Sequence, residues 1–283
     1  MLQFYCMPIR IVALDLDGTL LNSRSEISAN NLNALVAACE RGAQVVVTTG
    51  RRFYSALPYV KRLPCPVTMI TSNGALISTP DGEVMYRNFL PREVARQALV
   101  AARDYRPYCV AIFNVPGRGQ VTMQENAHPE GPISWYLKTS AASLKLVPDL
   151  ECALNTDPLQ VMVGGPPALI EPAQEILRAS SAGPHVNLTW TKYLMRNVSI
   201  LDVMNKGCSK GRALKYWAER CAVPPSEVMA IGDNFNDVEM LQFAGRPVLM
   251  GNRCEGLDGP GWHLTLSNDE DGVAAAIRTY VLE

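Results

Sequence analysis

Four short polar segments, each directly after a run of apolar residues, carry the side chains that could do chemistry. The carboxyl ends of parallel strands meet at one edge of a sheet, and ligands of open α/β sheets bind at that edge. We therefore expect the four segments to form one composite site. They are Asp15-Leu16-Asp17-Gly18-Thr19, Thr48-Thr49-Gly50-Arg51, Thr71-Ser72-Asn73-Gly74 and Gly232-Asp233-Asn234-Phe235-Asn236-Asp237.

The composite site would bring together up to four carboxylates, those of Asp15, Asp17, Asp233 and Asp237. Unpaired carboxylates repel one another strongly in a cleft of low dielectric constant, and a divalent cation removes that repulsion. A set of oxygen ligands favours Mg²⁺, which usually takes one or two carboxylates and keeps several waters. The sequence thus predicts a magnesium site.

The remaining groups of the composite site suit an anion. They are the hydroxyl of Thr49, the backbone N–H groups around Gly18 and Gly50, and the amide of Asn236. A metal, an anion cradle and a carboxylate nucleophile together are what phosphoryl transfer needs. Taken singly, each segment has an ordinary structural explanation, such as a turn or a helix N-cap. Their joint occurrence at strand ends favours a site.

The elements that must position these segments alternate between strand and helix, which is typical of a parallel sheet with right-handed crossovers. The strands are apolar throughout, as expected when helices cover both faces of a sheet. We expect strands over residues 11–14, 45–47, 67–70, 228–231 and 247–250, and helices over 31–41, 53–63, 212–221 and 237–243.

The middle of the chain has a different texture, with frequent proline and glycine, a strand expected over 159–163 and a helix over 169–179. We interpret it as an inserted α+β domain. The predicted fold class is α/β, a Rossmann-like doubly wound parallel sheet with this insertion. The core domain would comprise residues 1–85 and 202–283, and the insertion residues 86–201.

Composition excludes several classes of protein. The 283 residues are 48% hydrophobic and 19% charged, with 26 basic against 27 acidic side chains. No basic excess indicates a nucleic-acid or membrane-surface partner, and no apolar run approaches the roughly 18 residues of a membrane span. The eight cysteines are scattered without a Cys-x-x-Cys pair, as expected for reduced thiols of a cytoplasmic protein. No export signal is evident, and translation could begin at Met1 or Met7.

The polar segments resemble the motifs of a known family, the haloacid dehalogenase-like (HAD) hydrolases. Asn73-Gly74-Ala75 and the stretch 245–252 resemble more narrowly its Cof-type branch, sugar-phosphate phosphatase-like proteins of type IIB with an inserted α/β cap of C2 type. Arg253 and the glycine-rich stretch 254–263 depart from that pattern. The first to fourth motifs are matched by residues 11–21, Thr49-Gly50-Arg51, Ser209-Lys210-Gly211 and residues 232–237.

The resemblance implies a role for each matching residue. Asp15 would be the nucleophile that becomes an aspartyl phosphate, and Asp17 the general acid and then the base. Aspartate at position 17 indicates a phosphate ester as substrate rather than a haloalkane. The implied metal ligands are Asp15, Asp17 through its backbone carbonyl, and Asp233. The implied phosphate contacts are Leu16 through its backbone, Thr49, Gly50, Lys210 and Asn236, with Asp237, Asn73 and Arg51 in support.

Two lysine-glycine pairs could supply the third motif, at Lys206 and at Lys210. Lys210 opens the predicted helix over 212–221, where the helix N-terminus favours an anion. Lys206 precedes that helix, where a solvated lysine is the ordinary expectation. We therefore assign the phosphate contact to Lys210.

The function predicted from the sequence is a Mg²⁺-dependent phosphatase of small phosphorylated metabolites, acting without nucleic acid or membrane partners, as a monomer or homodimer. A phosphomutase on the same scaffold, or a catalytically idle binding or regulatory protein, are the alternatives. Trp190 and Lys192 are candidate substrate contacts in the insertion, whereas Trp135 and Tyr136 better suit packing. Sugar phosphates, pyridoxal phosphate and nucleotide monophosphates all fit as substrates.

Overall fold

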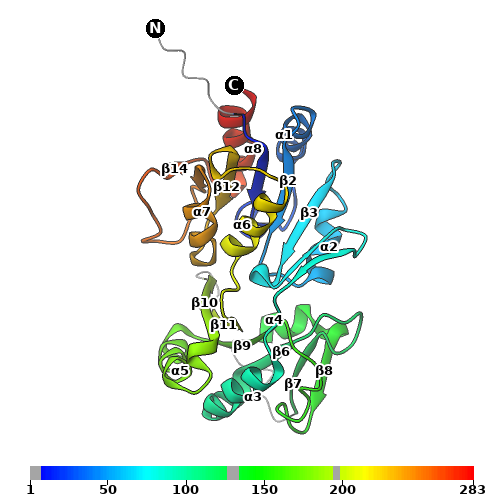
Figure 1. The fold of residues 1–283 in the computed structure, drawn as a ribbon, viewed down its shortest axis with the longest axis vertical. Coiled ribbons are helices and arrows are strands. Elements are labelled where there is room, and N and C mark those ends of the chain that lie inside the picture. Colours follow the sequence, from blue (N-terminus) through cyan, green and yellow to red (C-terminus); the bar gives the residue numbers. More distant parts are fainter. Residues whose placement is uncertain (1–7, 126–133, 194–197) are drawn as a thin grey trace. The chain divides into compact units, whose positions relative to one another are not determined.

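The chain forms two compact units in the computed structural model, which describes residues 8–125, 134–193 and 198–283 (Figure 1). The first unit comprises Met1–Tyr86 and Ser209–Glu283, and the second Arg87–Cys208. The predicted end of the insertion, residue 201, falls inside a strand, β11 (Val198–Asn205), which pairs with two strands of the second unit. The second unit therefore runs on to Cys208.

The first unit is built on an eight-stranded sheet in the order β14-β13-β12-β1-β2-β3-β4-β5. β1 lies in the interior of the sheet and pairs in parallel with both β2 and β12, so the prediction of a parallel α/β sheet is confirmed. The hairpin from β3 into β4 is antiparallel. The strands are β1 (Ile11–Leu14), β2 (Gln44–Thr48), β3 (Val67–Thr71), β4 (Leu76–Ser78), β5 (Val84–Arg87), β12 (Val228–Gly232), β13 (Arg246–Leu249) and β14 (His263–Leu264).

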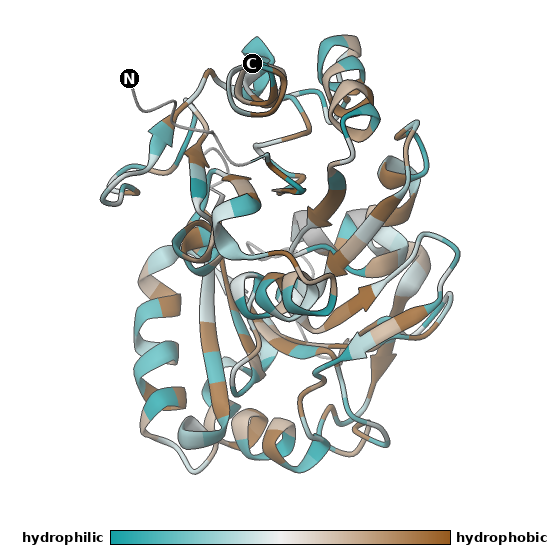
Figure 2. Cartoon of the chain, turned by 45° about the horizontal axis from the view of Figure 1, so that its top comes forward, coloured by the Kyte–Doolittle hydropathy of each residue, from teal (hydrophilic) through white to brown (hydrophobic). Residues whose placement is uncertain are grey.

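Helices cover both faces of this sheet. Ile11 and Ala13 of β1 pack in one apolar cluster with residues of α6 and α7. Successive strand residues point to opposite faces, so Val12 and Leu14 face the other side, and all four are fully buried. Figure 2 shows hydrophobic residues along these strands and mixed hydropathy on the helices. The helices are α1 (Ala29–Glu40), α2 (Phe53–Val60), α6 (Lys210–Arg220), α7 (Val238–Phe243) and α8 (Gly272–Ile277).

Serine side chains cap the beginnings of α1 and α6. The hydroxyl of Ser28 accepts a hydrogen bond from the N–H of Asn31 at 3.1 Å and caps α1. The hydroxyl of Ser209 does the same for α6 through the N–H of Arg212, at 3.1 Å. Such caps satisfy N–H groups that the first helical turn leaves without partners. The cap at Ser209 fixes the first turn of α6, which begins with Lys210.

The second unit is a mixed α+β structure with its own core. Its six-stranded sheet has the order β10-β11-β9-β6-β7-β8, and one apolar cluster joins one face of that sheet to α3 and α5. No helix in the described parts of the chain is long and apolar enough to cross a membrane. The elements are α3 (Arg92–Ala101), β6 (Cys109–Ile112), β7 (Val121–Gln124), α4 (Ser134–Thr139), β8 (Leu144–Val147), β9 (Gln160–Gly165), α5 (Pro167–Ala179), β10 (Val186–Tyr193) and β11.

The 3-10 turn Ser72–Gly74 lies between β3 and β4 and packs against the start of α6. Gly74 has a φ of +99°, and a Cβ placed there would lie 2.2 Å from the carbonyl oxygen of Ser209. Gly42 has a similar φ of +86° but no atom within 4 Å of such a Cβ.

We expect Gly42→Ala to lower the free energy of unfolding by about 1–2 kcal/mol through backbone strain alone. Gly74→Ala should cost about 2 kcal/mol more, because backbone must move.

Urea unfolding followed by circular dichroism measures both variants. Equal losses of stability would contradict the close approach of the turn and α6.

Candidate active site

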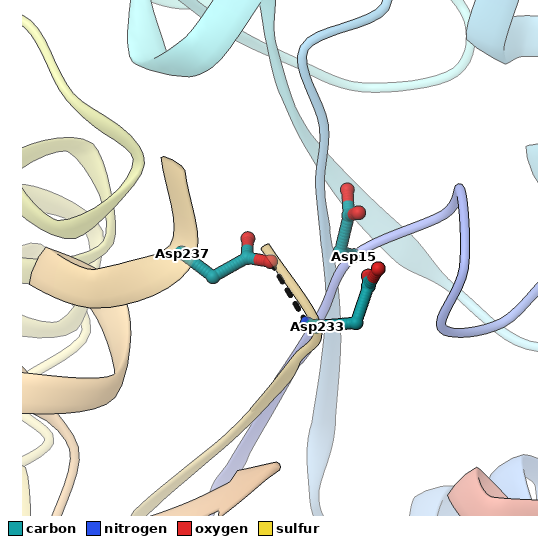
Figure 3. Close-up of side chains that lie close together, drawn as sticks. All are labelled: Asp15, Asp233 and Asp237. Carbon is teal, nitrogen blue, oxygen red and sulfur yellow. Dashed lines mark hydrogen bonds between the residues drawn. The ribbon is translucent and has the colours of Figure 1, made fainter. Parts of the chain in front are cut away.

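Two buried aspartates emerge side by side from neighbouring strands. Asp15 follows β1 and Asp233 follows β12, and the N–H of Asp15 donates to the carbonyl of Ile231 at 3.1 Å, continuing the parallel pairing. Asp237 comes from the turn that leads into α7. One carboxylate oxygen from each of the three aspartates lies within 4.8 Å of the others (Figure 3). The sequence prediction of a carboxylate cluster at this sheet edge therefore has a geometric counterpart.

Lys210 lies among these carboxylates with no side-chain surface exposed. Its Nζ donates to Oδ1 of Asp15 at 2.9 Å and to Oδ1 of Asp237 at 2.7 Å. Lys206, by contrast, is exposed and belongs to the second unit. Of the two lysines weighed from the sequence, the structure thus brings Lys210 to the carboxylates.

Asp237 has hydrogen bonds on both of its carboxylate oxygens. Oδ1 accepts from Lys210, and Oδ2 accepts from the backbone N–H groups of Asp233 and Asn234, each at 3.0 Å. A Cβ on Gly232 would lie 2.6 Å from the Cβ of Asp237, so the strand end and this side chain are in direct contact. Asp237 therefore holds Lys210 and shapes the turn after β12, which leaves Asp15 and Asp233 as the carboxylates open to a further partner.

The loop after β1 meets Asp233 at two residues. The hydroxyl of Thr19 donates to Oδ1 of Asp233 at 2.9 Å. Gly18 has a φ of +81°, and a Cβ there would lie 2.4 Å from Oδ2 of Asp233. Only glycine allows this approach. The sequence does not predict this role of Thr19, because its spacing in the motif does not reveal which side chain its hydroxyl contacts.

Asp17 points to a different partner. Arg51 donates to both of its carboxylate oxygens, from Nε to Oδ2 at 2.7 Å and from Nη2 to Oδ1 at 2.5 Å. The guanidinium carbon of Arg51 lies 4.6 Å from the centre of the Tyr59 ring. The side chain of Asp17 is thus outside the three-carboxylate cluster, and only its backbone could join a ligand set there. The sequence predicted a supporting role for Arg51 without showing that it pairs with Asp17.

The loops after β2 and β3 are joined by hydrogen bonds. The N–H of Asn73 donates to the carbonyl of Thr49 at 3.0 Å, and Nδ2 of Asn236 donates to Oδ1 of Asn73 at 2.9 Å. The hydroxyl of Thr49 accepts from the N–H of Arg51 at 3.0 Å. A Cβ on Gly50 would lie 3.1 Å from Oδ1 of Asn73. These predicted phosphate and supporting residues therefore form one connected group.

Three further candidates from the sequence are Leu16 in the first unit and Trp190 and Lys192 in the second. Leu16 has a fully buried side chain, so only its backbone could make the predicted phosphate contact. Trp190 is half-buried and packs against the apolar core of the second unit; its predicted substrate contact stays a prediction. The side chain of Lys192 lies outside the described residues.

Burial dominates the electrostatics of the cluster. It raises the pKa of Asp15 from 3.8 to about 7, and Lys210 opposes this rise without cancelling it. Burial also raises the pKa of Asp233, and the charge of Asp15 adds to the effect. For Lys210, burial lowers the pKa, but Asp15 and Asp237 outweigh it and the net shift is upward. The ammonium group is therefore held charged, and it offsets only part of the burial cost of Asp15 and Asp233.

Comparison with known proteins agrees with the motif pattern. The sequence model of the haloacid dehalogenase-like hydrolases matches residues 12–277. The chain is 29% identical to the phosphatase YwpJ of Bacillus subtilis, over 95% of this chain and 99% of that protein. It is 27% identical to the 5-amino-6-(5-phospho-D-ribitylamino)uracil phosphatase YitU of the same organism, over 95% and 97%.

A solved structure gives the same result. The crystal structure of a haloacid dehalogenase-like hydrolase from Bacteroides thetaiotaomicron matches with a TM-score of 0.78 and 27% identity, over 95% of this chain and 98% of that one. The resemblance inferred from the four motifs is confirmed by a match that spans both units: this chain belongs to the haloacid dehalogenase-like hydrolases.

Proposed function

We propose that the chain is a Mg²⁺-dependent phosphatase that hydrolyses phosphomonoesters of small metabolites through an aspartyl phosphate on Asp15. The observation that carries the proposal is the buried Lys210, bonded to Asp15 and Asp237 beside Asp233. The family match and the phosphatase names of its relatives support the enzyme class.

The nucleophile would be the oxygen of Asp15 that Lys210 does not hold. Lys210 bonds Oδ1, which leaves Oδ2 to attack phosphorus. A bond from this oxygen to phosphorus forms as the bond from phosphorus to the ester oxygen breaks. The ammonium group, fixed in a water-poor site, also suits the negative charge of the transferring phosphoryl group.

Asp17 would move the protons. It gives one to the departing ester oxygen, then takes one from the water that attacks the aspartyl phosphate. Arg51 donates to both carboxylate oxygens of Asp17, whereas proton transfer needs one of these oxygens to reach the ester. We infer that a bound ester loosens this pair, so that Arg51 holds Asp17 between turnovers and releases it during them.

The donor set fits a hard divalent cation. Asp15 and Asp233 are buried carboxylates whose raised pKa values Lys210 only partly offsets, and oxygen ligands of this kind suit Mg²⁺. Asp15, Asp233 and the backbone carbonyl of Asp17 would hold the ion, with Thr19 orienting Asp233. When bound, the ion supplies positive charge that stabilises the phosphoryl oxygens.

The second unit would act as the cap that selects the substrate, inserted between the second and third motifs. One relative is named for a phosphorylated ribityl-aminouracil, which supports a small phosphorylated metabolite as the substrate class. A cytoplasmic location, suited to such metabolites, is part of the same proposal.

The nucleophile is tested by Asp15→Asn, which keeps the shape of the side chain and removes the anionic oxygen. Phosphate monoesters hydrolyse extremely slowly without catalysis, so we expect kcat to fall by at least about 10³ with the fold intact. Phosphate release from a panel of phosphorylated metabolites, with Mg²⁺ and with chelator, is the measurement. Asp81→Asn, in an exposed turn, is the matched control. A folded Asp15→Asn variant with near-normal turnover contradicts the mechanism.

The third motif is tested by comparing two lysines. Lys210→Ala removes the ammonium group that lies 2.9 Å from Asp15, and kcat/KM should fall about 10²-fold or more. Lys206→Ala removes an exposed side chain and should stay within about threefold. Circular dichroism establishes that both variants are folded before kinetics. The reverse order of losses would move the motif to Lys206.

The cation site is tested by stability against pH. The pKa of Asp15 is raised from 3.8 to about 7 in the folded, metal-free protein. The folded state therefore binds protons that the unfolded chain has lost, and stability must fall as pH rises through this interval. A cation held by these carboxylates opposes the loss, so Mg²⁺ should stabilise the protein more at about pH 8 than at about pH 5.

Urea unfolding with and without millimolar Mg²⁺ gives the measurement. Asp15→Asn cannot ionise at this position, so its stability should depend less on pH. An effect of Mg²⁺ that is equal at both pH values argues against a cation on Asp15 and Asp233.

A further inference from the structure

We propose that Asn252 is a positioning residue for the loop after β1, which carries Asp17, and that it acts by holding the Gly18–Thr19 peptide. The inference rests on the proposed function, because it gives that loop the proton donor. Asn252 lies in the turn after β13, at the far side of β12 from β1. Its position is remote in sequence from the residues that it contacts.

The loop after β1 has few backbone hydrogen bonds within itself. The N–H groups of Leu20 and Leu21 donate to the carbonyls of Asp15 and Leu16, at 3.2 and 2.8 Å. The N–H of Thr19 reaches the carbonyl of Leu16 at 3.4 Å, a long hydrogen bond. The tip of the loop, around Gly18, therefore needs support from elsewhere.

Asn252 supplies that support with both ends of its amide. Nδ2 donates to the carbonyl of Gly18 at 2.8 Å, and Oδ1 accepts from the N–H of Asn268 at 2.9 Å. Asn268 in turn donates from Nδ2 to the carbonyl of Leu21 at 2.9 Å. The residue is exposed, so apolar packing does not account for an asparagine here, whereas the two opposed hydrogen bonds do.

The held peptide lies between two groups that the proposed reaction needs. Asp17 precedes it, and Thr19, which donates to Asp233, follows it. Gly18 is in close contact with Asp233, because a Cβ on Gly18 would lie 2.4 Å from that carboxylate. Asn252 holds the carbonyl of Gly18 through its Nδ2. The peptide is confined from both sides, and a misplacement of about 1 Å in such a site can cost about 10² in rate.

An asparagine is the side chain that fits both contacts. Aspartate keeps the acceptor for Asn268 but places an oxygen against the carbonyl of Gly18. Alanine removes both contacts. These two substitutions therefore separate the tie to Gly18, which both remove, from the tie to Asn268, which aspartate keeps.

The experiment compares Asn252→Ala and Asn252→Asp with the unmodified chain on two esters. Phenyl phosphate has a poor leaving group that needs a proton from the acid, whereas p-nitrophenyl phosphate has a good one. We expect kcat/KM for phenyl phosphate to fall about tenfold or more in both variants. The value for p-nitrophenyl phosphate should stay within about threefold, and the urea midpoint should not change.

A second measurement does not depend on turnover. Hydrogen exchange of the metal-free protein should be faster at the amides of Leu20 and Leu21 in both variants and unchanged in β2. Asn30→Ala is the matched control, since Asn30 is also exposed and donates to a distant residue, Asp271, at 2.6 Å. It should alter neither the ester ratio nor the exchange of the loop.

Equal losses on the two esters, no loss on either, or unchanged exchange of the loop would each overturn the positioning role. Failure of the unmodified chain to hydrolyse both esters would count against the proposed function instead. In that case hydrogen exchange still decides whether Asn252 holds the loop.

Discussion

The arrangement of the first unit depends on one buried charge, the ammonium group of Lys210. Removing Lys210 from water is costly, and only close, well-aligned carboxylates offset that cost. Asp15 and Asp237 do so at 2.9 and 2.7 Å. The ends of β1, β12 and α6 must therefore converge on one point, since each supplies or shapes one member of the group.

Close backbone packing makes that convergence possible. A Cβ on Gly211 would lie 2.4 Å from the backbone of Glu239, so α6 and α7 approach as only a glycine allows. The hydroxyl of Ser209 both caps α6 and contacts Oε2 of Glu239 at 2.5 Å.

Replacing a buried ion pair with apolar side chains often stabilises a protein. The charged group at Lys210 is therefore better explained by chemistry than by stability.

Much of this site could be predicted from the sequence, because each motif is local to the end of one strand. The apolar runs set the strands, and parallel pairing brings Asp15 and Asp233 together without any knowledge of side-chain contacts. The pairing of Arg51 with Asp17 and the hydrogen bond from Thr19 to Asp233 could not be predicted in this way. They depend on how loops turn after the strands end, which residue spacing does not fix.

The same limit applies further from the strand ends. The sequence makes Trp190 a candidate substrate contact, but it could not show that Trp190 lies opposite Leu201 and packs against the apolar core of the second unit. Hydropathy alone does not distinguish an aromatic residue that packs in a core from one that faces a ligand. Side-chain direction in a strand follows from register, and register depends on partners far away in the sequence.

The two aspartates on Lys210 differ in what remains open on each. Asp237 has both oxygens bonded, to Lys210 and to two backbone N–H groups, so it acts as a fixed counter-charge. Asp15 has one oxygen on the lysine and is the more exposed of the two, at 5% against 0%. Lys210 therefore bridges one carboxylate that it contacts at a single oxygen and a second whose two oxygens are both bonded. Without Asp237 the buried ammonium group would keep its bond to Asp15 but lose the fully bonded counter-charge, so the position of Lys210 depends on this residue.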